Sequence, residues 1–238
     1  MNDSTFPHHI SQQFDADLEE VRNNVLAMGG LVEQQLANAL TALTENDVSL
    51  GEEVITNDYK VNALEVTIDE ECNRILALRQ PTAIDLRLIV AIIKTITDME
   101  RIGDEAEKIG HLAVQLADQG GNDKFSALAH LGEHSRRMVH DALDAFARLD
   151  VEQAIQVVKE DLKTDREYEA ISRQLITFMM EDPRSISRFL NVMWAARSLE
   201  RIGDHARNIC EYIIYLVKGK DVRHTSLEKM EQAAREPR

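Results

Sequence analysis

The chain has 238 residues, with 42 acidic and 27 basic side chains and a formal net charge of −15. Such an acidic protein is a poor match for nucleic acid or an anionic membrane surface, which bind basic proteins. The composition is 44% hydrophobic but only 5% aromatic, with 10 glycines and 4 prolines, which favours an all-α fold.

The N-terminal residues lack the layout of a signal peptide, and the longest wholly apolar runs, 88–93 and 212–217, are far shorter than the ~20 residues of a membrane span. The two cysteines are too few for a disulfide framework. We therefore expect a soluble, cytoplasmic protein.

Three helices are predicted in the first half of the chain. Apolar residues at spacings of three and four predict a helix from about Ser11 to Glu45. Ser49 and Glu52 have the form of a capping box, which predicts that a second helix begins there and runs unbroken to about Arg79. Thr82, after a proline, predicts the start of a third helix, and two glycines at 120–121 close this half.

The second half of the chain repeats this plan at an offset of 103 residues. Asp150 predicts the N-terminus of a fifth helix, and Asp182-Pro183 predicts the start of a sixth that ends near Gly219. The residues that correspond at this offset are Leu36, Ala39, Leu40, Ala42, Leu43 and Asp47 with Val139, Ala142, Leu143, Ala145, Phe146 and Asp150. Long helices joined by short turns pack as antiparallel neighbours. We predict two similar three-helix bundles, over 1–119 and 121–219, and a charged tail at 220–238 that forms a short helix or frays.

One motif is written twice, as MERIGDEAEKI at 99–109 and LERIGDHARNI at 199–209. Its two acids are four residues apart, so they share one helix face, and like charges so placed destabilise a helix by a few tenths of a kcal/mol. The glycine between them costs about 1 kcal/mol relative to alanine. We expect a cation, a metal or a close backbone contact at the glycine to compensate.

If the preceding helix of each half is the neighbour, its acids converge on the repeated motif. The candidate ligands are Glu100, Asp104, Asp58 and Asn62 in the first half, and Glu200, Asp204, Asn208, Asp161 and Asp165 in the second. Oxygen ligands suit Mg²⁺, Ca²⁺, Mn²⁺ or iron. The alternative is a network of salt bridges with nearby basic residues, namely Arg101, Arg201, Lys60, Lys108 and Lys163. The residues alone leave both interpretations open.

A second pattern is weaker. His130 and His134, with His140 nearby, have the i, i+4 spacing that can bind zinc, but the sequence shows no acidic partner on that helix face, and solvated histidines are the simpler interpretation. No Glu-x-x-His pair, catalytic triad, Walker loop or dinucleotide fingerprint is present. We therefore do not predict an enzyme.

Several stretches together resemble the PhoU family of phosphate-signalling proteins. They are the doubled E-R-I-G-D motif, the run N-A-L-E-V-T-I-D-E-E-C at 62–72, Q-P-T-A-I-D-L-R-L at 80–88, D-A-L-D-A-F-A-R-L-D at 141–150 and R-N-I-C-E-Y at 207–212. The resemblance implies a cytoplasmic, non-enzymatic protein of two three-helix bundles, usually a homodimer. It also implies a negative regulator of phosphate uptake and of the phosphate-starvation response.

In that family the regulator is an adaptor between the ATPase of the phosphate ABC transporter and a sensor histidine kinase, so it meets the membrane only through its partners. The resemblance also implies a divalent metal (Mg, Mn, Fe or Zn) on the E/D-x-x-x-D motifs, here Glu100 with Asp104 and Glu200 with Asp204. Lys108 departs from the asparagine that many copies carry and that Asn208 keeps, which weakens the first site. The competing classes are a metal-binding helical scaffold and a metal-dependent enzyme, both unrelated to phosphate signalling.

Overall fold

A computed structural model describes residues 12–119 and 126–236. The first half contains α1 (Gln12–Glu45), α2 (Val48–Asn57), α3 (Tyr59–Arg79) and α4 (Ala83–Asp118). The second contains α5 (Ser126–Arg148), α6 (Val151–Glu181), a short 3-10 helix η1 (Pro183–Ser185), α7 (Ile186–Lys218) and α8 (Leu227–Arg235). No strand occurs in these ranges, so the all-α prediction is confirmed.

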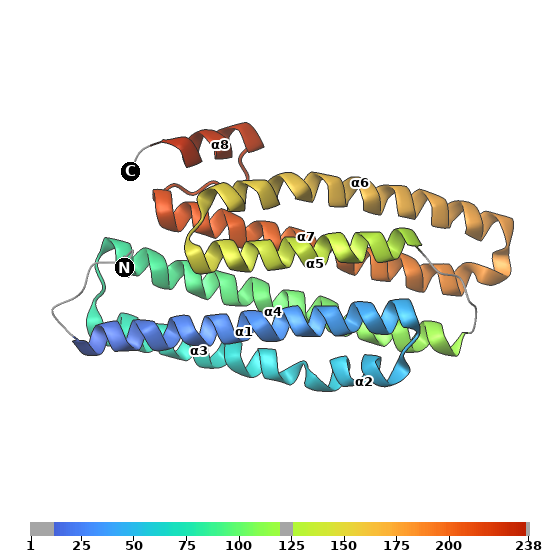
Figure 1. Cartoon of the computed structure of the whole chain (residues 1–238), viewed down its shortest axis with the longest axis horizontal. Helices are drawn as coiled ribbons and strands as arrows, with labels where there is room; N and C mark the ends of the chain where they lie inside the picture. Colours follow the sequence, from blue (N-terminus) through green and yellow to red (C-terminus); the bar gives the residue numbers. More distant parts are fainter. Residues whose placement is uncertain (1–11, 120–125, 237–238) are drawn as a thin grey trace.

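The helices form two elongated bundles that lie side by side. In Figure 1, α1 to α4 form the lower bundle and α5 to α7 form the upper one. The bundles contact each other mainly through α4 of the lower bundle, which packs against α7 of the upper one. The apolar stripes supply a continuous core in which Val32, Ile96, Ile109 and Ile202 are fully buried. None of the described helices has an apolar stretch long enough to cross a membrane.

The turns of the two helical hairpins have the same geometry, as the offset of 103 residues predicts. Asn46 and Leu149 have positive φ angles of 56° and 55°. Each is followed by an aspartate that caps the next helix: Asp47 Oδ1 accepts from the Leu50 amide and Asp150 Oδ1 from the Gln153 amide, both at 3.0 Å. These caps satisfy one of the free amides at each helix start.

Two details of the predicted second helix are wrong. It begins after Asp47 rather than at Ser49, because the aspartate carboxylate reaches the first-turn amide. It is also broken at Asp58, where α2 ends and α3 begins, whereas α6 continues through the equivalent Asp161. The break places the side chain of Asp58 beside α1 and α4, where it accepts a hydrogen bond from Gln35 of α1.

Of the two alternatives predicted for the C-terminal segment, a short helix or a frayed tail, the structure shows the helix α8. Met230 of α8 is fully buried, and Ala233 and Ala234 are buried beside it. The helix packs on α6 and α7, and Lys159 of α6 pairs with Glu231 at 2.7 Å. This short helix therefore covers one end of the second bundle.

Candidate metal centres

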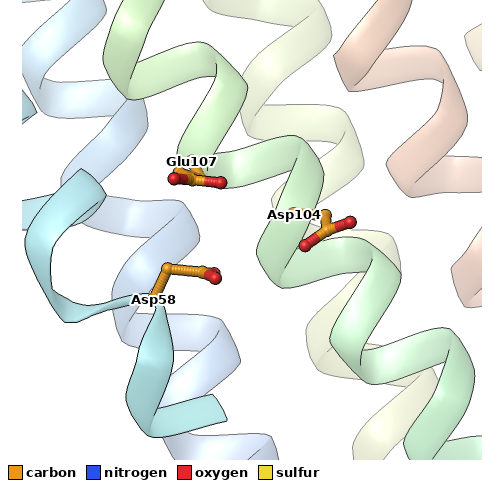
Figure 2. A group of neighbouring side chains, drawn as sticks. All are labelled: Asp58, Asp104 and Glu107. Atoms are coloured by element: carbon orange, nitrogen blue, oxygen red, sulfur yellow. The ribbon is translucent and has the colours of Figure 1, made fainter. Parts of the chain in front are cut away.

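The first acidic group joins the α2–α3 junction to α4. One carboxylate oxygen from each of Asp58, Asp104 and Glu107 lies within 4.8 Å of the other two. Figure 2 shows the three side chains around the space between these helices. Asp58 is buried and the other two are half-buried. Asp58 and Asp104 thus meet as the sequence predicted, and Glu107 is a member that sequence reasoning missed, although it lies one helical turn beyond Asp104.

The second acidic group joins α6 to α7. One oxygen from each of Asp161, Asp165 and Asp204 lies within 4.8 Å of the other two, and all three had been predicted to converge. Asp161 is only 1% exposed. The equivalent helices of the two bundles therefore each bring three carboxylates together, and Asp58 and Asp104 of the first group correspond to Asp161 and Asp204 of the second.

The repeated glycine lets the two helices approach at each acidic group. A Cβ on Gly103 would lie 3.2 Å from Gln35 Oε1 and 3.4 Å from Asp58 Oδ1. A Cβ on Gly203 would lie 3.4 Å from Thr164 Cγ2. The nearest atoms at both glycines belong to side chains and not to the backbone that was expected; the contact is tight at Gly103 and an ordinary van der Waals contact at Gly203. In each bundle the aspartate of the neighbouring helix lies beside the glycine of the E-R-I-G-D motif.

Two side-chain amides complete the first group. Gln35 Nε2 and Asn62 Nδ2 each donate to Asp58, at 2.8 Å, one to each carboxylate oxygen. Their own oxygens, Gln35 Oε1 and Asn62 Oδ1, are buried and accept no hydrogen bond. A buried oxygen without a donor is costly, and a cation is one group that satisfies it. Gln35 is a further residue that sequence reasoning missed.

The remaining predicted ligands lie outside the two groups of three. Glu100 is half-buried on α4 and is not among the three carboxylates that meet. Glu200 Oε1 accepts from Arg197 at 2.6 Å, while its buried Oε2 accepts no hydrogen bond. Asn208 donates to Asp98 of α4 at 3.1 Å, so its amide is directed to the contact between the bundles and not to the second group.

Crowding raises the pKa of several of these acids. Burial, then the charges of Asp165 and Asp204, raises the pKa of Asp161 to about 6. Burial, then the charge of Asp204, raises the pKa of Glu200 to about 7. Burial and neighbouring carboxylates also raise the pKa values of Asp104 and Asp204. Each group thus concentrates more negative charge than its surroundings compensate, which is the condition that a bound cation relieves.

The two groups differ in how much positive charge the protein itself supplies. The position of Glu107 in the first motif is held by Arg207 in the second. Arg207 donates to Asp161 Oδ2 at 3.1 Å and pairs with Glu211 at 3.3 Å. The first group has only acids and amides at these positions, so the duplicated sites are chemically distinct.

The basic residues proposed as salt-bridge partners mostly point elsewhere. Arg201 pairs with Glu105 at 2.5 Å, and Lys108 pairs with the same carboxylate at 3.0 Å. Lys163 pairs with Glu160 at 2.6 Å. Lys108 still lowers the pKa of Asp104 through its charge, but its ammonium is bonded outside the first group. Among the described residues, the ion pairs that do reach the acidic groups join Arg207 to Asp161 at 3.1 Å and His111, when protonated, to Glu107 at 3.7 Å. The sequence predicts neither pair.

Fold and site together define a class: an all-helical protein of two duplicated bundles with an acidic group of three carboxylates in each. The PhoU domain family model matches residues 25–113 and 128–213, one match in each bundle. The chain therefore belongs to the PhoU family.

Named relatives match over nearly the whole chain. A "Phosphate-specific transport system accessory protein PhoU homolog" of Pseudomonas putida is 57% identical over 97% of this chain and 90% of its own length. The Escherichia coli (strain K12) protein of the same name, without "homolog", is 51% identical over 94% of this chain and 93% of its own. A crystal structure of PhoU from Pseudomonas aeruginosa, 53% identical, superposes with a TM-score of 0.85 over 87% of this chain and 100% of that chain.

Proposed function

We propose that this protein is a cytoplasmic negative regulator of phosphate uptake and of the phosphate-starvation response. The observation that carries the proposal is the match, over 97% of this chain, to a relative named as an accessory protein of the phosphate-specific transport system. The match also covers 90% of that relative's own length, so the similarity is not confined to one segment of either protein. An accessory role needs no catalytic site, and none is proposed here.

The regulator would act as an adaptor between the ATPase of the phosphate ABC transporter and its sensor histidine kinase, reaching the membrane only through them. Long helices offer rigid faces for such contacts, and several large apolar side chains are exposed on them, including Leu78 at 68%, Met180 at 79% and Trp194 at 60%. Exposed apolar surface of this kind favours a protein partner. Both cysteines are buried and unpaired, which fits the reducing cytoplasm.

Deleting the gene for this protein is expected to leave the phosphate-starvation response switched on when phosphate is plentiful. An alkaline-phosphatase reporter in phosphate-rich medium measures this, and the intact chain supplied in trans is expected to restore repression. A reporter that stays repressed in the deletion strain would contradict the proposed function.

We also propose a homodimer. Apolar side chains that no other part of the described chain covers are a reason for self-association. Sedimentation equilibrium at micromolar protein is expected to give twice the monomer mass of 27.0 kDa. The measurement needs moderate salt, because the net charge of −15 repels a second copy at low ionic strength. One species at the monomer mass would refute the dimer.

We propose that each acidic group binds a divalent cation, such as Mg²⁺, Mn²⁺ or iron. Asp58, Asp104 and Glu107 would hold it in the first bundle, with Asn62 and Gln35 able to add amide oxygens. Asp161, Asp165 and Asp204 would hold it in the second, with Glu200 at its edge. The support is chemical: these are oxygen donors, several are buried without a hydrogen-bond donor, and hard cations prefer such ligands. The cation would stabilise the packing of α4 on the α2–α3 junction and of α7 on α6.

A further inference from the structure

A groove between α5 and α6 contains a group of side chains that neither the acidic sites nor the proposed adaptor role uses. It encloses about 540 Å³, and its lining includes His130 and His134 of α5 with Glu160 and Glu167 of α6. The histidines are four residues apart and so share a helix face. The sequence offered them no acidic partner, but α6 brings two carboxylates to that face.

His134 lies between the two carboxylates and is only 6% exposed. Its Nε2 is 3.1 Å from Glu160 Oε2, in a hydrogen bond. Its Nδ1 is 3.3 Å from Glu167 Oε1, yet this buried nitrogen has no hydrogen-bond partner. A neutral imidazole that donates Nε2–H to Glu160 presents the Nδ1 lone pair to the Glu167 carboxylate. Two such electron-rich atoms repel unless a proton or a cation lies between them.

His130 brings a second nitrogen to the same carboxylate. Its Nδ1 is 3.4 Å from Glu167 Oε2, and its side chain is 69% exposed. Separations of about 3.3 Å are those of two ligand atoms that each lie about 2.0–2.1 Å from one tetrahedral zinc ion. The two nitrogens face different oxygens of Glu167, and the three residues do not bring one ligand atom each within 4.8 Å of the other two. Binding one ion therefore requires a rotation of the His130 side chain, which its exposure permits.

We propose that His130, His134 and Glu167 bind one Zn²⁺ ion, with Glu160 orienting His134 from outside the coordination sphere. Two imidazoles and one carboxylate are a common zinc ligand set that leaves a fourth position for water. A metal-bound histidine usually donates its other ring N–H to a carboxylate, which is the place of Glu160. The nitrogen ligands also give this site a different metal preference from the two acidic groups, whose all-oxygen ligands suit harder cations.

Lys163 explains why Glu160 has the outer role. Its Nζ is 2.6 and 2.9 Å from the two oxygens of Glu160. Glu160 therefore lies between His134 on one side and an ammonium group on the other. A direct bond from Glu160 to zinc would place that ammonium next to the ion.

The first bundle has no equivalent site. At the offset of 103 residues the positions of His130, His134, Glu160 and Glu167 are held by Ala27, Leu31, Asn57 and Leu64. None of these is a good zinc ligand. The four side chains are thus not inherited from the duplicated plan, unlike the aspartates of the acidic groups.

Zinc titration of the full-length, chelator-treated protein tests the proposal. The background carries Asp104→Asn, Glu107→Gln, Glu200→Gln and Asp204→Asn, because Zn²⁺ competes with Mg²⁺ for carboxylate ligands. It also carries His8→Gln with His9→Gln, which removes another histidine pair. Competition with a chromophoric chelator is expected to show one zinc equivalent, and histidine ring NMR signals of His130 and His134 are expected to shift on binding. His130→Gln, at an exposed position, is expected to weaken zinc binding at least tenfold without unfolding, and Glu160→Gln to weaken it about 10- to 100-fold.

His140→Gln is the matched control, because His140 is also an exposed α5 histidine paired with a glutamate, Glu33, at 2.7 Å. It is expected to bind zinc as the parent does. The proposal is overturned if the parent binds no zinc equivalent, or if His130→Gln and His140→Gln bind zinc equally well.

Discussion

Adding Mg²⁺ or Mn²⁺ to the chelator-treated protein is expected to raise its melting temperature by about 5–10 °C for each acidic site that is filled. A ligand that binds only the folded state adds RT ln(1 + [L]/Kd), or about 2.7 kcal/mol at a hundredfold excess over Kd. The cation would also offset the burial and the mutual repulsion that raise the pKa values of Asp161 and Glu200. Calorimetry with and without chelator measures the shift.

Variants at the two sites separate their contributions. Glu200→Gln with Asp204→Asn is expected to abolish the part of the shift that comes from the second bundle, and Asp104→Asn with Glu107→Gln the part from the first. Glu133→Gln with Glu169→Gln is the matched control, since it removes two charges at exposed positions and is expected to keep the whole shift. Equal shifts in all three double variants would show that the cation binds elsewhere.

The same variants have a pH signature without metal. The folded protein holds protons on Asp161 and Glu200 at pH values where the unfolded chain has released them. The free energy of unfolding in chelator is therefore expected to fall as pH rises from about 4, where unfolded carboxyls titrate, to about 7, the raised pKa of Glu200. Glu200→Gln with Asp204→Asn is expected to flatten this fall, and saturating Mg²⁺ to suppress it. The same pH dependence in the parent and in Glu200→Gln with Asp204→Asn would exclude the repulsive group.

Replacing Asp98 by alanine is expected to lower the free energy of unfolding by about 3–5 kcal/mol, as when one partner of a buried charged network is removed. Asp98 is 1% exposed on α4, and its two carboxylate oxygens accept hydrogen bonds from three side chains of α7. Oδ1 accepts from His205 at 2.7 Å and Asn208 at 3.1 Å, and Oδ2 accepts from the Tyr212 hydroxyl at 2.8 Å. Alanine would leave all three donors without this acceptor at the contact between the bundles.

Denaturant unfolding measures the loss in the free energy of unfolding for Asp98→Ala, and Glu105→Ala is the variant with which it is compared. Glu105 is 2% exposed on the same helix, but its partners Arg201 and Lys108 are 44% and 50% exposed, so water can solvate them after the change. Glu105→Ala is therefore expected to cost about 1–3 kcal/mol, as for a hydrogen bond to a charged group. An Asp98→Ala variant within about 0.5 kcal/mol of the parent, the range of surface changes, would show that this network does not hold the bundles together.

Sequence periodicity was sufficient for the helical class and the duplicated plan. The spacing of apolar residues follows from helix geometry, which also decides that acids four residues apart share a face. The repeated glycine indicated a close approach, and Asp161, Asp165 and Asp204 could be grouped because both helices carry acids at matching spacing. The helical class and the shared faces depend on residues near one another in the chain, where local geometry dictates position. The grouping of the three aspartates depended in addition on the assumption that consecutive helices pack together.

Tertiary structure alone decided which distant groups meet. Helix periodicity does not give the rotation and sliding of one helix against another, so it could not assign Gln35 to Asp58, Asn208 to Asp98, or Glu160 and Glu167 to His134. It also did not reveal the break at Asp58, because the residues there are compatible with a helix. The sequence by itself determined the fold class, the repeat and the faces that carry charge. The packing of the helices decided the membership of each site, since contacts across bundles depend on side chains as many as 114 residues apart.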